Sequence, residues 1–332
     1  MTVLVTGGAG YIGSHMVWEL LEAGEEVVVL DRLSTGFEWA VAPEAELVVG
    51  DVADKELAAR IIREKGVDAI IHFAGSIVVP ESVADPLAYY ENNTCKTRAL
   101  IETAVREGVP NFIFSSTAAV YGGAGLEPVR ENAPLSPESP YGASKLMSER
   151  MLRDAAAAHG LRYTALRYFN VAGADPKGRT GQSTPGATHL IKVACETALG
   201  KRASMQVFGT DYPTPDGTCM RDYIHVSDLA AAHRLALQRL REGGENMVAN
   251  CGYGHGYSVL EVIESVRRVF GHDFEVVTGE RRAGDAAAVV ANSDLARREL
   301  GWQPKLDDLD RIVTDALSWE RILTTRNSAR AG

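Results

Sequence analysis

A tyrosine and a lysine four residues apart, Tyr141 and Lys145, form the pair in this sequence best suited to proton transfer. On a helix, residues at i and i+4 project from one face, so the phenol and the ammonium would lie side by side. A free phenol has a pKa of ~10, and a nearby positive charge favours the phenolate, which can act as a base. Thr117, at the end of an apolar run, offers a hydroxyl to hold a substrate oxygen and relay its proton. The spacing alone is weak evidence, because chance gives roughly 0.3 such pairs in this chain.

A glycine-rich stretch indicates what the tyrosine would work with. TGGAGYIG, residues 6–13, follows an apolar run and precedes a helix-like pattern. Between a strand and a helix, such glycines leave backbone N–H groups free to bind a pyrophosphate. The stretch predicts a dinucleotide site formed by Gly7, Gly10, Tyr11, Ile12 and Gly13. An ordinary strand-to-helix turn is the alternative, since 32 of the 332 residues are glycine.

These motifs are positioned by apolar runs that alternate with amphipathic helical patterns. We expect strands over residues 3–5, 26–30, 47–49, 69–72, 112–115 and 164–167, and helices over 11–23, 55–65, 86–106 and 141–159. Continuous apolar strands indicate a parallel sheet covered on both faces, which is the doubly wound, Rossmann-type α/β fold. Residues 1–170 would form the dinucleotide domain, 171–325 mainly a smaller C-terminal α/β substrate-binding domain, and 326–332 a tail. Segments near 226–252 are expected to return to the first domain.

Residues at the ends of the strands predict the cofactor. Asp31 ends the second strand, where a carboxylate binds a ribose diol and repels a 2′-phosphate, so NAD is favoured over NADP. Arg32 would soften that preference, and a solvated strand end is the alternative for Asp31. An NAD⁺ ring near Tyr141 would add its charge to that of Lys145. Further expected contacts at the strand ends are Asp51 and Val52 at the adenine, and Phe73, Ala74 and Gly75 along the cofactor.

Composition and charge narrow the partners. The chain is 45% hydrophobic and has a net charge of −10, which disfavours nucleic acid and anionic membranes as partners. No apolar run is long enough to span a bilayer and no basic, cleavable leader is evident, so we expect a cytoplasmic protein. The four cysteines are scattered, which argues against a metal site or a disulfide framework. An anionic substrate would need local arginines.

Longer segments resemble one family. The chain contains, in this order, TGGAGYIGSH, HFAG, YYENN, FSSTAAVYG, SPYGASKLMSE, LRYFNVAGA, VFGTDYPTPDGTCMRDYIHVSDLA and RRAGD. These segments are similar to the extended short-chain dehydrogenases/reductases, and specifically to the UDP-glucose (UDP-galactose) 4-epimerase family. The resemblance implies tightly held NAD, a UDP-sugar substrate and a homodimer. It also implies that Tyr141 takes the proton of the sugar 4-OH while C4 passes hydride to the nicotinamide. The 4-keto sugar then rotates and receives the hydride on its other face.

The same resemblance assigns roles to individual residues. Thr117, Tyr141 and Lys145 match the catalytic positions. The additional cofactor positions are Asn92, Ser115, Tyr141, Lys145 and Tyr168, and the substrate positions are Thr117, Tyr141, Asn170, His189, Leu190, Phe208, Arg221, Arg282, Asp285 and Val289. Arg221 and Arg282 match diphosphate-binding arginines, which would supply the positive field that the acidic chain lacks. Phe208 matches a residue near the uracil, and Asp285 matches a ribose-binding carboxylate. A surface ion pair with Asp222 or Asp228 is the alternative for Arg221.

Three positions depart from the family pattern. Ile77 stands where many members carry a lysine that reaches the cofactor ribose, so we expect weaker retention of NAD. His189 replaces a common amide, so its contact with the nucleotide would differ. Val289 replaces a bulky tyrosine of some members, which enlarges the sugar pocket. Our hypothesis is that N-acetylated UDP-hexosamines are accepted as well as UDP-hexoses.

Other functions remain open on this evidence. 4-Epimerases of UDP-arabinose or UDP-xylose, UDP-glucuronate or UDP-GlcNAc are not separated by these motifs. A nucleotide-sugar 4,6-dehydratase needs a further acid and base, in related enzymes an Asp-Glu pair, whereas Ala118 and Ala119 follow Thr117 here. A non-catalytic NAD sensor typically lacks the tyrosine or the lysine, and both are present. In the implied homodimer, helices at about 86–107 and 141–159 would pair, although Met147 and Leu152 could equally face the sheet.

Overall fold

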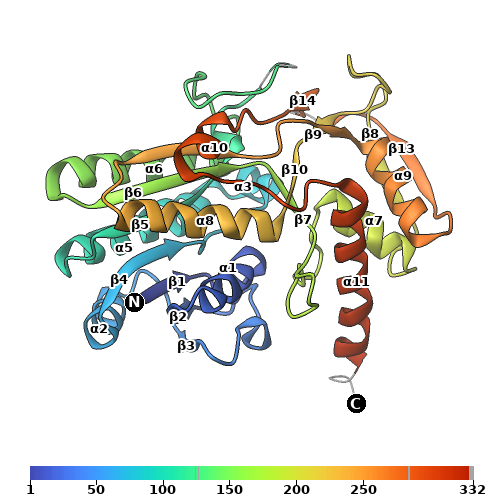
Figure 1. Ribbon diagram of the computed structural model, residues 1–332. Coiled ribbons are helices and arrows are strands. Elements are labelled where there is room, and N and C mark those ends of the chain that lie inside the picture. Colours follow the sequence, from blue (N-terminus) through green and yellow to red (C-terminus); the bar gives the residue numbers. More distant parts are fainter. Residues whose placement is uncertain (124, 126, 283–284, 329–332) are drawn as a thin grey trace.

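A seven-stranded parallel sheet organises the computed structural model, which describes residues 1–123, 125, 127–282 and 285–328 (Figure 1). The strands are β1 (Thr2–Thr6), β2 (Glu26–Asp31), β3 (Glu46–Val49), β4 (Val67–His72), β5 (Asn111–Thr117), β6 (Arg162–Tyr168) and β11 (Met247–Cys251). Their spatial order is β11-β6-β5-β4-β1-β2-β3. The order reverses at β1, so a ligand crevice is expected at the carboxyl ends of β1 and β4. The Rossmann-type fold predicted from the sequence is confirmed.

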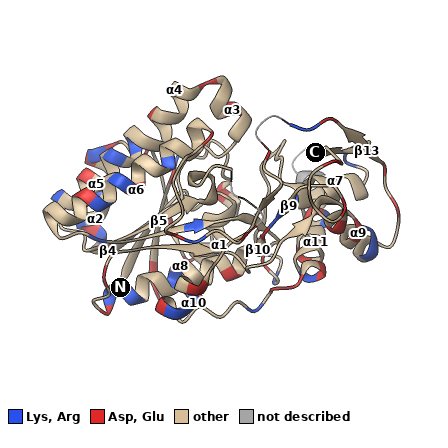
Figure 2. Cartoon of the chain, turned by 90° about the horizontal axis from the view of Figure 1, so that it is seen from above, with Lys and Arg blue, Asp and Glu red and all other residues tan. Residues whose placement is uncertain are grey.

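Helices cover both faces of this sheet. One face carries α2 (Lys55–Lys65), α5 (Lys96–Arg106) and α6 (Pro140–His159), and the other carries α1 (Tyr11–Glu22) and α8 (Val226–Arg241), as Figure 2 shows. Side chains of the strands alternate between these layers, with Leu4 and Phe112 facing the first and Val5 and Ile113 the second. Burial on both faces explains why the strands are continuous apolar runs in the sequence.

The single helix expected over residues 86–106 is wrong. The segment consists of α4 (Pro86–Tyr89), a π-helical turn η2 (Tyr90–Cys95) and α5, and a short helix α3 (Val79–Ala84) precedes it. A π-helical turn bonds i to i+5 and so shifts successive residues around the helix axis. Within η2, Asn92 and Asn93 both reach Ser76 in the loop after β4. A regular helical period does not predict that pair of contacts.

A smaller lobe stands at the carboxyl ends of the strands. It contains short sheets built from β7 (Asn170–Ala172), β8 (Met205–Phe208), β9 (Met220–Arg221), β10 (Tyr223–His225), β12 (Tyr257–Ser258), β13 (Val276–Gly279) and β14 (Ala288–Val289). The helices α7 (Leu190–Ala198), α9 (Val259–Phe270) and α11 (Leu309–Ser328) pack on one another in this lobe (Figure 1). Between them the chain returns to the large sheet as α8 and β11, and α10 (Asp294–Leu300) packs beside these two. Within the described ranges, no helix has the length and apolarity to cross a membrane.

Candidate active site

The turn from β1 into α1 is packed so tightly that only glycine fits at positions 7 and 13. Gly7 has a φ of +73°, and a Cβ there would lie 2.6 Å from the amide nitrogen of Ala74 after β4. A Cβ on Gly13 would lie 2.1 Å from the carbonyl oxygen of Gly7. Helix α1 has no side-chain cap and no acidic residue in its first turn, so its N-terminal N–H groups favour an anion. This cradle fits the pyrophosphate of a dinucleotide.

Two carboxylates follow the neighbouring strands β2 and β3. Asp31 is buried and accepts hydrogen bonds from the backbone N–H groups of Ala9 (3.0 Å) and Leu33 (2.8 Å). Each of its oxygens keeps a further lone pair, as binding to a ribose diol requires. Burial would raise the pKa of Asp51, but hydrogen bonds from Lys96 and a backbone N–H outweigh it and lower that pKa. The contact of Asp51 with adenine stays a prediction, as does that of its buried neighbour Val52.

The loop after β4 is held by two asparagines of η2, one of which sequence reasoning missed. The predicted Asn92 donates to the hydroxyl of Ser76 at 2.9 Å. Asn93 is 2% exposed, accepts from the backbone N–H of Ser76 at 2.7 Å and donates to its carbonyl at 2.9 Å. Its amide also donates to Ser144 on α6 at 3.1 Å. Asn93 therefore joins the cofactor-side loop to the catalytic helix, and two adjacent asparagines were the only signal for it in the sequence.

The three catalytic candidates meet where β5 ends. Thr117 is the last residue of β5, and Tyr141 and Lys145 lie on successive turns at the start of α6. The Thr117 hydroxyl accepts from the backbone N–H of Ala119 at 3.1 Å and lies close enough to the Tyr141 phenol to lower its pKa. Lys145 Nζ donates to the carbonyl of Ser115 on β5 at 3.0 Å. All three side chains are buried, so water competes little for these contacts.

Burial dominates the electrostatics of this trio. It raises the pKa of Tyr141, and the neighbouring Thr117 hydroxyl offsets this only in part. It lowers the pKa of Lys145 to about 8, because the charged form is disfavoured away from water. Lys145 is not among the groups that lower the phenol pKa, and its ammonium donates instead to the Ser115 carbonyl. The positive nicotinamide ring, the other charge considered above, would have to make Tyr141 a usable base.

A hollow lies between the large sheet and the smaller lobe. Its walls include Tyr11, Asn170, Gly173, Gln182, His189, Leu190, Tyr223 and Trp319. The structure thereby brings Tyr11, a predicted cofactor residue, together with the predicted substrate residues Asn170, His189 and Leu190. The catalytic trio does not line this hollow. The connection follows the end of β6, where the Tyr168 hydroxyl lies 2.6 Å from Ser115 Oγ and Asn170 begins β7 shortly afterwards.

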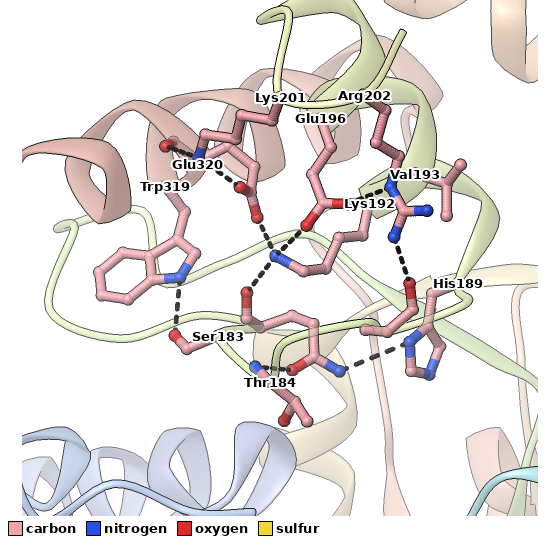
Figure 3. A network of polar contacts seen from close by, with 12 residues as sticks. Ser183, Thr184, His189, Lys192, Val193, Glu196, Lys201, Arg202, Trp319 and Glu320 are labelled. Atoms are coloured by element: carbon pink, nitrogen blue, oxygen red, sulfur yellow. Dashed lines mark hydrogen bonds and ion pairs between the residues drawn. The ribbon is translucent and has the colours of Figure 1, made fainter. Parts of the chain in front are cut away.

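A group of charges, buried at Lys192 and Glu320, holds the loop that forms one wall of this hollow (Figure 3). The group, here called the Lys192 cluster, consists of Lys192, Glu196, Lys201, Arg202 and Glu320. Lys192 donates to the backbone carbonyl of Gln182 at 3.0 Å. The Gln182 amide lies 3.4 Å from His189 Nδ1, and burial lowers the pKa of His189, so the imidazole is neutral near pH 7. The cluster therefore fixes the backbone that carries two wall residues.

The remaining predicted substrate residues form two pairs. Arg282 stacks on Phe208, with the guanidinium carbon 3.6 Å from the ring centroid. Arg221 lies 3.6 Å from Asp285 and donates to the carbonyl of Ala286 at 2.9 Å. The alternative partners of Arg221 are wrong, because the buried carboxylates of Asp222 and Asp228 bind other groups, including backbone N–H donors. The two pairs are connected, because the backbone N–H of Asp285 donates to the carbonyl of Arg282 at 3.3 Å, so each arginine contacts a residue of the predicted site.

Val289 connects these pairs to the catalytic end of β5. It lies opposite Arg221 where β14 pairs with β9. It also packs in a small apolar cluster with Ala118 and Phe169. Ala118 directly follows Thr117, so the residue that the resemblance places at the sugar lies near the catalytic strand end.

Comparison with proteins of similar sequence and fold identifies the family of this chain. The model of the NAD dependent epimerase/dehydratase family matches residues 3–252. A UDP-glucose 4-epimerase of Azospirillum brasilense is 58% identical over 97% of this chain and 92% of its own length. The structure of a UDP-glucose 4-epimerase from Brucella ovis in complex with NAD is 44% identical, with a TM-score of 0.93 over 96% of this chain and 98% of its own.

A second solved structure extends the range of sugars among the relatives. It is a UDP-Glc/GlcNAc 4-epimerase from Campylobacter jejuni, 48% identical, with a TM-score of 0.85 over 97% of this chain and 99% of its own. The chain belongs to the NAD dependent epimerase/dehydratase family and, within it, to the UDP-glucose 4-epimerases.

Proposed function

We propose that this chain is an NAD-dependent UDP-glucose 4-epimerase that interconverts UDP-galactose and UDP-glucose. The observation that carries the proposal is the meeting of Thr117, Tyr141 and Lys145 at the end of β5, on the same edge of the sheet as the glycine cradle. A 4,6-dehydratase is not favoured, because the 3-10 turn η3 (Ala118–Val120) after Thr117 carries no acid or base. A non-catalytic sensor is not favoured either, since both Tyr141 and Lys145 are in place.

The side chains divide the work of proton transfer. When bound, NAD supplies the group that oxidises C4 of the sugar and reduces it again. Tyr141 removes the proton of the sugar 4-OH and returns it at the end, while the Thr117 hydroxyl beside it lowers the pKa of the phenol. Lys145 supplies positive charge beside the cofactor-side loop, where a Cβ on Gly75 would lie 3.6 Å from its Nζ. Burial of the three groups keeps water from the reacting atoms.

The binding roles follow from the positions already described. We assign the pyrophosphate of NAD to the glycine loop and its adenosine ribose to Asp31. The diphosphate of the substrate is assigned to Arg221 and Arg282, its ribose to Asp285, and its uracil to the region of Phe208. Two guanidiniums in a chain of net charge −10 provide the local field that a dianionic group needs.

Incubation of the purified protein with UDP-galactose, without added NAD, tests the proposal. Formation of UDP-glucose, followed by chromatography, would establish the activity and show that NAD accompanies the protein. Conversion only after NAD is added would keep the activity and indicate weak retention of the cofactor. If neither condition gives UDP-glucose, the proposed substrate is wrong. UDP-arabinose or UDP-xylose, UDP-glucuronate and UDP-GlcNAc would then be tested.

We also propose that N-acetylated UDP-hexosamines are substrates. Val289 is small and lies near the catalytic strand end, where a larger side chain would crowd the C2 substituent of the sugar. The Campylobacter jejuni relative described above acts on both kinds of sugar according to its name. The ratio of kcat/KM for UDP-GalNAc to that for UDP-galactose should exceed ~10⁻³, which corresponds to about 4 kcal/mol of discrimination. A smaller ratio would contradict the hypothesis. In the variant Val289→Tyr this ratio should be lower than in the wild type.

We propose further that the chain forms a homodimer in the cytoplasm. Exposed apolar side chains gather on α3, α4 and α6, and they are Val79, Val83, Leu87 and Met147, with Ile77 just before α3. Met147 faces outward, whereas Leu152 is fully buried against the sheet. A second copy would cover this surface, and light scattering of the purified protein would show the mass of a dimer. The four cysteines are unpaired, which suits a reducing compartment.

A further inference from the structure

Two buried charged residues beside the catalytic trio have no assigned role. Glu149 lies on α6, one turn beyond Lys145, and Arg167 lies on β6. Arg167 Nε and a terminal guanidinium nitrogen donate to the two carboxylate oxygens of Glu149 at 2.9 and 2.6 Å. Their side chains are only 6% and 4% exposed. The pair is therefore bidentate and almost free of water.

Glu149 also binds the catalytic strand. It accepts a hydrogen bond from the Ser116 hydroxyl at 2.5 Å, and Ser116 stands opposite Arg167 in the pairing of β5 with β6. Three successive turns of α6 thus contact the last three residues of β5. Tyr141 meets Thr117, Lys145 meets the Ser115 carbonyl, and Glu149 meets Ser116. The register of helix and strand is fixed at three points, of which Glu149 is the only one outside the trio.

The network continues on the other side of Thr117. Arg167 donates to the Tyr121 hydroxyl at 2.9 Å, and Tyr121 in turn donates to Asn250 Oδ1 on β11 at 2.7 Å. Tyr121 directly follows η3, the turn that leaves Thr117. Ser116 and Tyr121 therefore anchor the chain before and after the catalytic hydroxyl, and both are bound to the Glu149–Arg167 pair.

Stability alone is a poor explanation for such a pair. Removing two charges from water is costly, and apolar residues of similar volume are often as stable in the same place. We propose that Glu149 and Arg167 are positioning residues, which hold α6 in register with the end of β5 so that Thr117, Tyr141 and Lys145 meet. The inference rests on the proposed function, because it concerns the same reaction.

The test replaces both charges at once, so that neither is left unpaired. In the double variant Glu149→Met/Arg167→Met, kcat for UDP-galactose should fall by about tenfold or more while KM changes by less than about threefold. The matched control is Asp68→Leu/Arg241→Met, which removes the bidentate pair of 2.8 and 2.9 Å between the start of β4 and the end of α8. It also removes the contact of Arg241 with Glu25, which keeps its ion pair with the N-terminal ammonium. The bidentate pair lies at the amino end of β4, whereas the catalytic groups lie at the carboxyl ends of the strands, so its loss should leave kcat unchanged.

A second readout needs no turnover. 3-Fluorotyrosine placed at position 141 of the NAD-bound protein reports the environment and ionisation of this phenol by fluorine NMR. The neighbouring Thr117 hydroxyl lowers the pKa of Tyr141, so moving Thr117 away should shift the titration to higher pH and change the fluorine signal. The control pair should change neither. Ser116→Ala removes a single hydroxyl, is expected to fold, and should give smaller changes in the same direction.

The outcomes separate the two proposals. A loss of thermal stability in the network variant with unchanged kcat and an unchanged fluorine titration would overturn the positioning role. An equal loss of kcat in network and control variants would overturn it as well. If the wild-type protein converts none of the UDP-sugars named above, the proposed function fails, and the fluorine titration alone decides whether Glu149 and Arg167 position Tyr141.

Discussion

Two buried ion pairs of similar exposure support the two halves of the site in different ways. Glu149 and Arg167, 6% and 4% exposed, join one helix to two neighbouring strands whose register is already fixed by backbone pairing. Lys192 and Glu320, 7% and 4% exposed, join α7 to α11 and hold an irregular loop through a backbone carbonyl. The first region places reacting groups, and the second shapes a wall of the hollow. We therefore expect damage to the first to reduce the rate and damage to the second to reduce affinity.

The largest effect should come from the reacting phenol in the first region. Tyr141→Phe removes the proposed base, so kcat for UDP-galactose should fall by about a thousandfold, within the range typical of general acid–base groups. The NAD content of the purified variant should match that of the wild type, because a ring of the same shape remains. Tyr163→Phe, which alters another buried tyrosine on β6, serves as the control and should keep its activity. Full activity in Tyr141→Phe would mean that another group is the base.

The two regions also differ in how far the sequence predicts them. Tyr141, Lys145 and the glycine loop lie within regular elements, where side-chain spacing follows from the helical period and glycine from close backbone contact. Arg221 and Asp285 are brought together by β9 and β14, strands of two residues that have no periodicity to detect. These residues, with Phe208 and Arg282, were assigned only through the family resemblance.

Some residues of the helices and strands around the catalytic trio are also not predicted from the sequence. The π-helical turn η2 follows no residue period, so the role of Asn93 was not expected. Glu149 belongs to a segment that carries the resemblance, and Arg167 interrupts the apolar pattern of β6, yet neither was singled out. A buried charge is recognised in a sequence only when its partner is known, and these two partners come from different elements. The structure supplies that pairing.

A change in the Lys192 cluster should weaken substrate binding and leave kcat nearly unchanged, in contrast to changes near the catalytic trio. Glu320→Gln removes the carboxylate shared by Lys192 and Lys201, and the loop that carries Gln182 and His189 should loosen. We expect KM for UDP-galactose to rise by about tenfold, equivalent to ~1.4 kcal/mol of binding, while kcat stays within about threefold. Steady-state kinetics measures both constants.

The control for this prediction is a carboxylate without a role in the loop. Glu46→Gln breaks an ion pair with Lys65 whose side chains are 51% and 37% exposed, and it should change neither constant. A fall in kcat with unchanged KM in Glu320→Gln would contradict the division of labour between the two regions.

A smaller effect is expected at Ile77, in the loop after β4, where many family members carry a lysine that reaches the cofactor ribose. Ile77 follows the Asn93-bound Ser76 and is 48% exposed, so a lysine at this position has room to reach the cofactor. Ile77→Lys should slow the loss of NAD on dialysis by about fivefold, in keeping with one added charge-assisted hydrogen bond. The bound NAD remaining after dialysis is measured by absorbance of the released cofactor. Ile77→Met is the control for side-chain length, and equal retention in the two variants would contradict the prediction.

The smallest effect is expected on the free energy of unfolding. It distinguishes Lys145, which is bound to a carbonyl, from Lys192, which is bound to carboxylates. Lys145 donates to the Ser115 carbonyl, and in the described part of the chain no carboxylate forms an ion pair with it. Burial lowers its pKa from 10.5 to about 8. Between these values the unfolded chain binds a proton that the folded chain does not, so the free energy of unfolding should rise with pH across this window. Below pH ~8 both states are protonated and this contribution is constant.

Urea unfolding at two pH values isolates this effect. The difference in free energy of unfolding between wild type and Lys145→Met cancels the titration of all other groups, to the extent that they are unaffected by the substitution. This difference should shift in favour of the wild type between pH ~7.5 and pH ~9.5. A constant difference would mean that the ammonium finds compensation in the folded protein, and the Ser115 carbonyl would then suffice to hold a buried charge. In that case the catalytic region would resemble the Lys192 cluster more closely than the geometry indicates.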